Sequence, residues 1–129
     1  MAHRILVVDD DEDIRNLVAV MLKAEGYQVV LASTGKEALE TLEKELADLI
    51  VLDVMMPGLD GWEVCRQIKS NACTREIPVI FLTVRQQPLD RIIGTEVLHA
   101  SGYIYKPFER EELISTIFDC LNTAAPPVK

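Results

Sequence analysis

The stretch that decides the fold is DLIVLDVMMPGLDG, residues 48–61. Positions 49–52 are four apolar residues in a row, which indicates a strand buried on both faces, because a half-exposed strand would alternate apolar and polar side chains. The run ends in the carboxylate of Asp53, and the chain then turns at Pro57-Gly58. A buried charge is unfavourable unless other groups compensate it. The stretch therefore predicts a buried strand and a set of groups that face Asp53.

Similar apolar runs occur elsewhere in the chain, and stretches with a helical period separate them. Together with DLIVL (48–52), the predicted strands are RILVV (4–8), YQVVL (27–31), PVIFL (78–82) and GYIY (102–105). Five strands that alternate with five helices are typical of an α/β domain, in which helices cover both faces of a parallel sheet. A length of 129 residues fits one such domain.

The predicted helices carry apolar side chains every three or four residues. The inward stripes are expected at Ile14, Leu17, Val18, Met21 and Leu22, at Ala38, Leu39, Leu42 and Leu46, and at Leu113, Ile114, Ile117, Phe118 and Leu121. A fourth helix, from about Pro88 to Ala100, is expected to turn Leu89, Ile92, Ile93 and Val97 inward. This helix contains Gly94, which costs about 1 kcal/mol relative to alanine in a helix interior.

Polar residues mark where three of the helices should begin. Thr34 and Glu37 stand three residues apart, as in a capping box, and Asp60 and Glu63 repeat the spacing with an aspartate as the cap. The acids at 11–13 fall in the first turn of the first helix, where negative charge favours the helix dipole. We therefore interpret these acids as a solvated cap rather than as ligands.

Composition excludes several classes of function. The formal net charge is −8, which argues against non-specific nucleic-acid binding and against docking on anionic membranes. The chain has three cysteines and no CxxC pair, so the sequence indicates neither a disulfide framework nor a zinc site. It shows no apolar run of membrane-spanning length and no signal-peptide pattern, so a cytoplasmic location is expected.

The ends of the predicted strands carry the polar groups that could form a site. In open α/β sheets, ligands bind outside the carboxyl ends of the strands. There the first strand delivers Asp9 and Asp10, the third Asp53, the fourth Thr83 and the fifth Lys106. Three ionised acids and one lysine leave a charge of about −2, and crowded carboxylates either raise their pKa values or recruit cations. Hard oxygen ligands of this kind suit Mg²⁺.

A carboxylate beside Mg²⁺, a lysine and a hydroxyl is equipped to attack phosphorus, because an aspartyl phosphate is an established covalent intermediate. Phosphorylation would replace about one negative charge with roughly two. Lys106 and the cation could hold that charge, and Thr83 could donate a hydrogen bond to a phosphoryl oxygen.

At this point the chain resembles the response-regulator receiver domain of two-component signalling. The matching segments are ILVVDDD (5–11), LIVLDVMMPGLDGWE (49–63), IPVIFLTV (77–84) and GYIYKPF (102–108). The resemblance extends from about Arg4 to Leu121. It implies a doubly wound (βα)5 flavodoxin-like sandwich with a five-stranded parallel sheet in the strand order 2-1-3-4-5. Residues 1–122 would then form the receiver domain, and 123–129 a C-terminal tail or the start of a linker.

The resemblance also implies a phosphoacceptor and a metal site. Asp53 would accept the phosphoryl group. Asp9, Asp10 and Asp53 would hold Mg²⁺, together with the backbone carbonyl of Met55.

Further residues would sense the phosphoryl group. Lys106 would pair with its oxygens, Thr83 would be the switch hydroxyl that turns toward it, and Tyr103 would be the switch aromatic that moves with Thr83. The family also suggests a cis bond between Lys106 and Pro107, and X-Pro bonds are the usual place for cis peptides.

Other positions could set the rates of this particular chain. Met55 and Arg85 stand two residues beyond Asp53 and Thr83, where the family tunes the lifetime of the phosphoryl group. An ordinary loop role is an equally open interpretation of both. Val84 replaces the small residue usual after the switch threonine, and we expect it to narrow access to the acyl phosphate. His99 replaces a glycine at a position that often needs a positive φ.

The function that follows is a phosphorylation-activated switch, not a turnover enzyme. It would accept phosphate from a sensor histidine kinase or a phosphotransfer protein. It would then change its helix 4–strand 5–helix 5 face to control an output domain or partner. A phosphorylation-dependent dimer would be one form of that control.

The sequence leaves three alternatives to weigh. A phosphorylation-independent interaction module of the same fold would be expected to have lost site residues, which are all present here. A haloacid-dehalogenase-type phosphatase would need a second acid two residues after its nucleophile, where Met55 stands. A flavodoxin-like FMN binder would not offer carboxylates to the phosphate.

Overall fold

The computed structural model describes residues 2–84 and 87–124. Its core is a five-stranded parallel sheet with the order β2-β1-β3-β4-β5, as predicted. The strands are β1 (Arg4–Val8), β2 (Gln28–Ala32), β3 (Leu49–Leu52), β4 (Val79–Thr83) and β5 (Gly102–Tyr105). The first and last match the predicted ranges, β2 and β4 each lie one residue later, and β3 starts one residue later.

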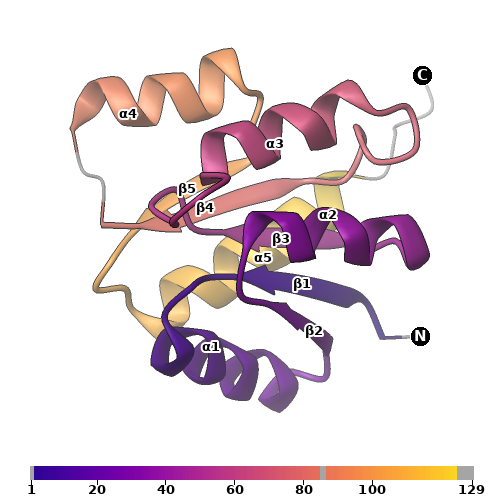
Figure 1. Cartoon of the computed structure of the whole chain (residues 1–129). Helices are drawn as coiled ribbons and strands as arrows, with labels where there is room; N and C mark the ends of the chain where they lie inside the picture. Colours follow the sequence, from indigo (N-terminus) through magenta and orange to yellow (C-terminus); the bar gives the residue numbers. More distant parts are fainter. Residues whose placement is uncertain (1, 85–86, 125–129) are drawn as a thin grey trace.

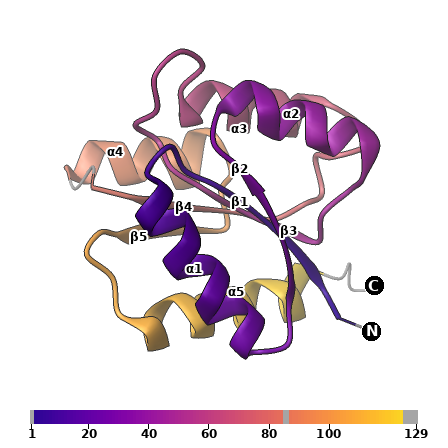
Figure 2. The ribbon, with the colours of Figure 1, turned by 60° about the horizontal axis from the view of Figure 1, so that its bottom comes forward.

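Helices cover both faces of this sheet, so the chain is the predicted doubly wound α/β sandwich. The helices are α1 (Glu12–Ala24), α2 (Gly35–Lys44), α3 (Gly61–Ser70), α4 (Pro88–Ile92), the π-helix η1 (Ile93–Val97) that continues α4, and α5 (Arg110–Ala124). Helices α1 and α5 lie on one face and α2, α3 and α4 on the other (Figures 1 and 2).

The strands are apolar on both faces because each face contributes to a separate core. Leu6, Ile50 and Phe81 pack under α2 and α3, whereas Ile5 and Val51 pack against α1 and α5. Successive side chains of a strand point to opposite faces, so a continuous apolar run fills both cores. This explains why the strand sequences are continuous apolar runs and do not alternate between apolar and polar residues.

Strand register brings the ends of the strands together. Val8 of β1 lies opposite Leu52 of β3, so the residues that follow them, Asp9 and Asp53, emerge side by side. The Asp53 amide donates to the Val8 carbonyl at 3.0 Å, which continues the pairing beyond the last strand residue.

Side chains cap the helices that lead away from this edge. The Asp11 carboxylate accepts hydrogen bonds from the amides of Asp13 and Ile14, as expected of a solvated cap. The Thr34 hydroxyl accepts from the amide of Glu37 at 3.0 Å. Asp60 likewise accepts from Glu63 at 3.0 Å. The predicted starts of α1, α2 and α3 are therefore confirmed, and these starts fix where the loops at the carboxyl edge turn.

The fourth helix differs from the prediction. It ends at Val97 rather than Ala100, and its second half is a π-helix. Leu89, Ile92 and Val97 were expected inside, but they are 64%, 51% and 62% exposed. The inward face is formed instead by Asp90, Gly94 and a half-buried Ile93. Val97 lies in the π-helix, which has more residues per turn than an α-helix, so the α-helical period assigns it to the wrong face. Leu89 and Ile92 lie before the π-helix, in α4, where Asp90 faces inward instead.

The other stripes are mostly buried, with single exceptions near their edges. Leu17 and Phe118 are exposed, and Leu46 lies beyond the end of α2 and is also exposed. Long apolar side chains at the margin of a stripe commonly remain partly in water, so these positions do not alter the layers.

Close packing explains why glycine, despite its low helix propensity, stands at position 94. A Cβ there would lie 3.1 Å from Tyr103, 3.2 Å from Phe81 and 3.3 Å from Trp62, so the glycine lets η1 lie directly on three aromatic rings. His99 follows with a φ of 61°, which confirms the positive φ expected where it replaces glycine. Among the helices of the described residues, none has the length and apolar content to cross a membrane.

Candidate functional site

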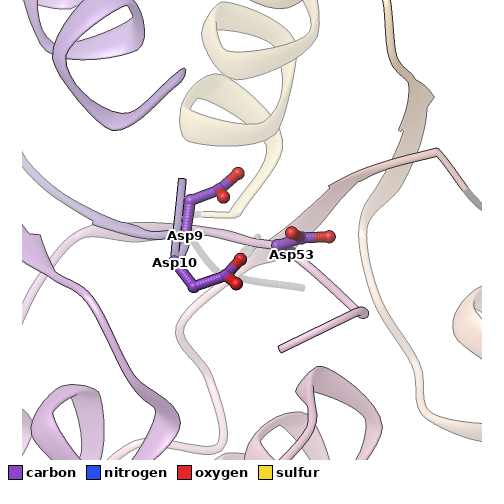
Figure 3. Close-up of side chains that lie close together, drawn as sticks. All are labelled: Asp9, Asp10 and Asp53. Carbon is purple, nitrogen blue, oxygen red and sulfur yellow. The ribbon is translucent and has the colours of Figure 1, made fainter. Parts of the chain in front are cut away.

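Three carboxylates meet at the carboxyl edge of the sheet. Asp9 and Asp10 follow β1 and Asp53 follows β3, and one oxygen from each lies within 4.8 Å of the others (Figure 3). Asp9 is only 2% exposed and Asp53 only 5%, whereas Asp10 is exposed. The cluster is thus buried on its protein side and open to solvent at Asp10.

Lys106 provides the counter-charge from the end of β5. Its ammonium donates to Asp9 Oδ2 at 2.7 Å and lies 3.4 Å from Asp53 Oδ2. Its backbone amide donates to the Thr83 carbonyl at 2.9 Å, which fixes the lysine against the end of β4. The peptide bond to Pro107 is cis, as the resemblance suggested. One ammonium therefore serves two buried carboxylates.

The pKa values of Asp53 and Lys106 are both raised, but for different reasons. Burial is the largest cause of the raised pKa of Asp53; Lys106 opposes the rise, and the charge of Asp9 adds to it. Burial also acts to lower the pKa of Lys106, but the hydrogen bond and charges of Asp9 and Asp53 outweigh it and raise that pKa overall. Asp53 is thus a poorly solvated carboxylate facing a firmly charged ammonium.

The loop after β3 holds Asp53 in place. Asp53 Oδ1 accepts a hydrogen bond from the Met55 amide at 3.2 Å. Further along, Gly61 donates to the Val54 carbonyl at 2.9 Å, and a Cβ on Gly61 would lie 2.1 Å from the Asp53 carbonyl oxygen. Only glycine allows α3 to begin this close to the Asp53 backbone. The sequence reasoning missed Gly61, and its position directly after the cap Asp60 was the available signal.

The two residues predicted to respond to the site are both buried. Thr83 ends β4, and its neighbour in register on β5 is Tyr105. Tyr103 is buried on β5, with its ring 5.9 Å from that of Phe81 and 5.5 Å from that of Tyr105. Thr83 therefore lies at the same edge as the acids, and Tyr103 connects this region to the cluster beneath η1.

The candidate rate-setting residues lie on the outside of the site. Met55 is exposed immediately after Asp53 and Val54, and Val84 is 55% exposed immediately after Thr83. The third of them, Arg85, lies outside the described residues. Two exposed apolar side chains thus lie in the loops that follow Asp53 and Thr83.

The donor set fits a hard divalent cation. Carboxylate oxygens with solvent on one side suit Mg²⁺, which keeps several waters and binds few protein groups. Three acids against one ammonium also leave negative charge that a cation would neutralise. The cluster can therefore hold Mg²⁺ on chemical grounds.

Comparisons with known proteins agree with this geometry. Solved structures that match include a putative response regulator from Chloroflexus aurantiacus J-10-fl, with 34% identity over 95% of this chain and 99% of that one, at a TM-score of 0.90. The chemotaxis response regulator CheY4 of Vibrio cholerae matches with 32% identity over 92% and 98%, at a TM-score of 0.86.

A third similar structure is the receiver domain of a signal transduction histidine kinase from Syntrophus aciditrophicus. It has 32% identity over 99% of this chain and 96% of that one, with a TM-score of 0.88. The family model for the response regulator receiver domain matches residues 5–118. With its sheet order and its pocket of Asp9, Asp10, Asp53 and Lys106, the chain belongs to the response-regulator receiver domain family.

Proposed function

We propose that the chain is a phosphorylation-activated signalling switch that accepts a phosphoryl group on Asp53. The observation that carries this proposal is the position of the Asp53 carboxylate: it is buried, faces Lys106 at 3.4 Å and shares a site with two other acids. Burying crowded charges costs stability, and buried acids with perturbed pKa values cluster at functional sites, which supports a chemical role for Asp53.

The chemistry is a transfer of one phosphoryl group. A carboxylate oxygen of Asp53 attacks phosphorus in a phosphohistidine, the new O–P bond forms as the P–N bond breaks, and the imidazole leaves. Lys106 is placed to pair with the added phosphoryl charge, in exchange for its present contact with Asp53. The donor would be a sensor histidine kinase or a phosphotransfer protein, the partners expected of a receiver domain.

Asp9, Asp10 and Asp53, with the Met55 carbonyl, would hold Mg²⁺. Bound there, the cation would neutralise charge that develops on the phosphoryl oxygens. The chain's own contribution is to place three carboxylates together and to bury two of them, which strengthens their electrostatic interaction.

Phosphorylation would be sensed by Thr83 and Tyr103, which would change the α4–β5–α5 face. That face would control an output domain or partner. A phosphorylation-dependent dimer would be one form of that control. Tyr103 supports this route, because its ring packs on the same cluster that supports η1. The receiver would occupy residues 1–122, leaving 123–129 as a tail or linker. A cytoplasmic location would give it access to a kinase that uses ATP.

The test is incubation with Mg²⁺ and acetyl phosphate, followed by mass spectrometry of the intact protein. The expected result is one phosphoryl adduct that Asp53→Asn abolishes. Asp13→Asn is the matched control, since Asp13 is an exposed acid near the same edge. It should leave the adduct unchanged.

Two results would count against the proposal. An adduct that persists in Asp53→Asn would place the phosphoryl group elsewhere. An absence of adduct with acetyl phosphate and with a phosphorylated kinase would instead favour a phosphorylation-independent interaction module.

A further inference from the structure

We propose that Arg15 is a positioning residue for cation binding: it fixes the peptide that aims Asp10 at the metal site. The inference rests on the proposed magnesium site and adds to it a residue outside the carboxylate set. Arg15 lies in α1, and its Nη1 donates to the backbone carbonyl oxygen of Asp9 at 2.9 Å, in a partly buried contact.

Asp9 is held at each of its polar atoms. Its amide donates to the Ala32 carbonyl at 3.2 Å, Oδ1 accepts from the Asp11 amide at 2.9 Å, and Oδ2 accepts from Lys106. Its carbonyl oxygen is the atom that Arg15 holds. A donor to this oxygen fixes the plane of the peptide that joins Asp9 to Asp10, because a peptide unit is rigid.

Asp10 has no comparable anchor of its own. Its side chain is exposed, and among the described residues no group donates a hydrogen bond to its carboxylate. Yet one of its oxygens lies within 4.8 Å of those of Asp9 and Asp53 (Figure 3). Its reach toward the site therefore depends on where the backbone places its Cα, and Arg15 holds the carbonyl of the peptide that precedes it.

The charge of Arg15 also acts on Glu37, at the start of α2. Hydrogen bonds from Ser33 are the largest cause of the lowered pKa of Glu37, and the charge of Arg15 contributes to the same shift. Glu37 Oε1 accepts from the Ser33 amide at 2.7 Å and from the Ser33 hydroxyl at 3.0 Å. The contact that holds Arg15 is therefore its hydrogen bond to the Asp9 carbonyl, and its interaction with Glu37 is one of charge alone.

The positive charge of Arg15 and its positioning role predict opposite changes in Mg²⁺ affinity when Arg15 is removed. As a cation close to a metal site, it repels Mg²⁺, so its removal would tighten Mg²⁺ binding if charge alone mattered. As a positioning residue it orients a ligand, so its removal should weaken Mg²⁺ binding. The sign of the change in affinity separates the two effects.

The experiment is calorimetric titration of the full chain with MgCl₂ at fixed ionic strength, for the wild type and Arg15→Ala. We expect the dissociation constant for Mg²⁺ to rise about tenfold in Arg15→Ala, as when other groups that orient metal ligands are removed. Arg15→Lys, which keeps a donor on a flexible stem, should recover part of that loss.

The matched control is Lys23→Ala, which removes one positive charge from the last turn of the same helix. That change should leave Mg²⁺ affinity within about twofold, because salt screens distant exposed charges. Urea unfolding without Mg²⁺ shows that each variant is folded. If Arg15→Ala fails to fold, Arg15→Met keeps the apolar stem and carries the same expectation.

An unchanged or tighter dissociation constant in a folded Arg15→Ala would overturn the inference and leave the proposed function standing. Absence of Mg²⁺ binding by the wild type would instead overturn the metal site itself, and the inference with it.

Discussion

The ammonium of Lys106 lies closer to Asp9, at 2.7 Å, than to the proposed phosphoacceptor Asp53, at 3.4 Å. Lys106 is thus bonded mainly to a residue that would remain a carboxylate after phosphorylation. Asp9 can hold the lysine in place while its contact with Asp53 is exchanged for one with the phosphoryl group. Under the proposed function, Lys106 would therefore keep its place when Asp53 is phosphorylated.

Lys106→Met should destabilise the protein by about 3 kcal/mol at neutral pH, because it leaves two buried carboxylates without their shared cation. Urea unfolding without Mg²⁺ measures the change. Adding Mg²⁺ should reduce the difference from the wild type, since the cation would replace the missing charge. Lys36→Met, an exposed change on α2, should alter the free energy of unfolding by less than about 0.5 kcal/mol.

Asp53→Asn should make the protein more stable at neutral pH. Burial raises the folded-state pKa of Asp53 above its unfolded value of 3.8, so the folded state binds the proton more tightly. The wild type therefore loses stability as the pH rises from about the unfolded pKa through the folded one. The asparagine variant lacks this loss, so its advantage should grow across that window and then level off.

Urea unfolding at several pH values between 3 and 8, without Mg²⁺, tests this prediction. Asp13→Asn serves as an exposed control whose effect on the free energy of unfolding should be small. An advantage of Asp53→Asn that shrinks as the pH rises would contradict the raised pKa.

How much the sequence could predict depended on the kind of contact. The pocket of acids and lysine could be predicted because strand ends in a parallel sheet meet at one edge, so residue order alone places Asp53 beside Asp9. The exposure of Val97 could not be predicted, since the π-helix after α4 shifts the face that a regular period assigns.

Contacts that residues make with backbone atoms could not be predicted from the sequence either. Arg15 binds the carbonyl oxygen of Asp9, and Gly61 approaches that of Asp53. Every residue has a carbonyl, so no residue type marks the partner in advance. These contacts become visible only once the turns after β1 and β3 are known.

Gly61→Ala should destabilise the protein by about 3 kcal/mol or more, because the added Cβ would lie 2.1 Å from a backbone oxygen and 2.7 Å from the Val54 Cα. The start of α3 would have to move away from the Asp53 loop. Gly94→Ala is the comparison: its Cβ meets only ring atoms at 3.1 Å or more, and it gains about 1 kcal/mol of helix propensity.

Urea unfolding of both glycine variants should give the larger loss for Gly61→Ala. An equal or larger loss for Gly94→Ala would mean that the three rings beneath η1 yield less readily than the backbone at Asp53.

Only Cys73 should react quickly with a thiol reagent in the native protein. Cys73 is exposed, whereas Cys65 and Cys120 are buried, and burial raises the pKa of Cys65 to about 11. A buried thiol with a raised pKa presents little thiolate, the reactive form. Ellman's reagent should therefore show one rapid equivalent that Cys73→Ser removes, and three equivalents after denaturation. Fast modification of Cys65 would contradict its burial.

Val84→Ala should change the rate at which acetyl phosphate phosphorylates Asp53, or the rate at which the phosphoryl group is lost. Val84 is 55% exposed and directly follows Thr83, so its side chain can cover one approach to the acidic cluster. If it limits access, alanine should speed attack by water and shorten the phosphoryl lifetime several-fold, with little effect on stability because an exposed methyl pair contributes little. Val20→Ala, a change at an exposed valine of α1, should leave both rates unchanged. Lifetimes measured by intact mass after removal of acetyl phosphate would decide the matter, and equal lifetimes for Val84→Ala and the wild type would show that Val84 does not control access.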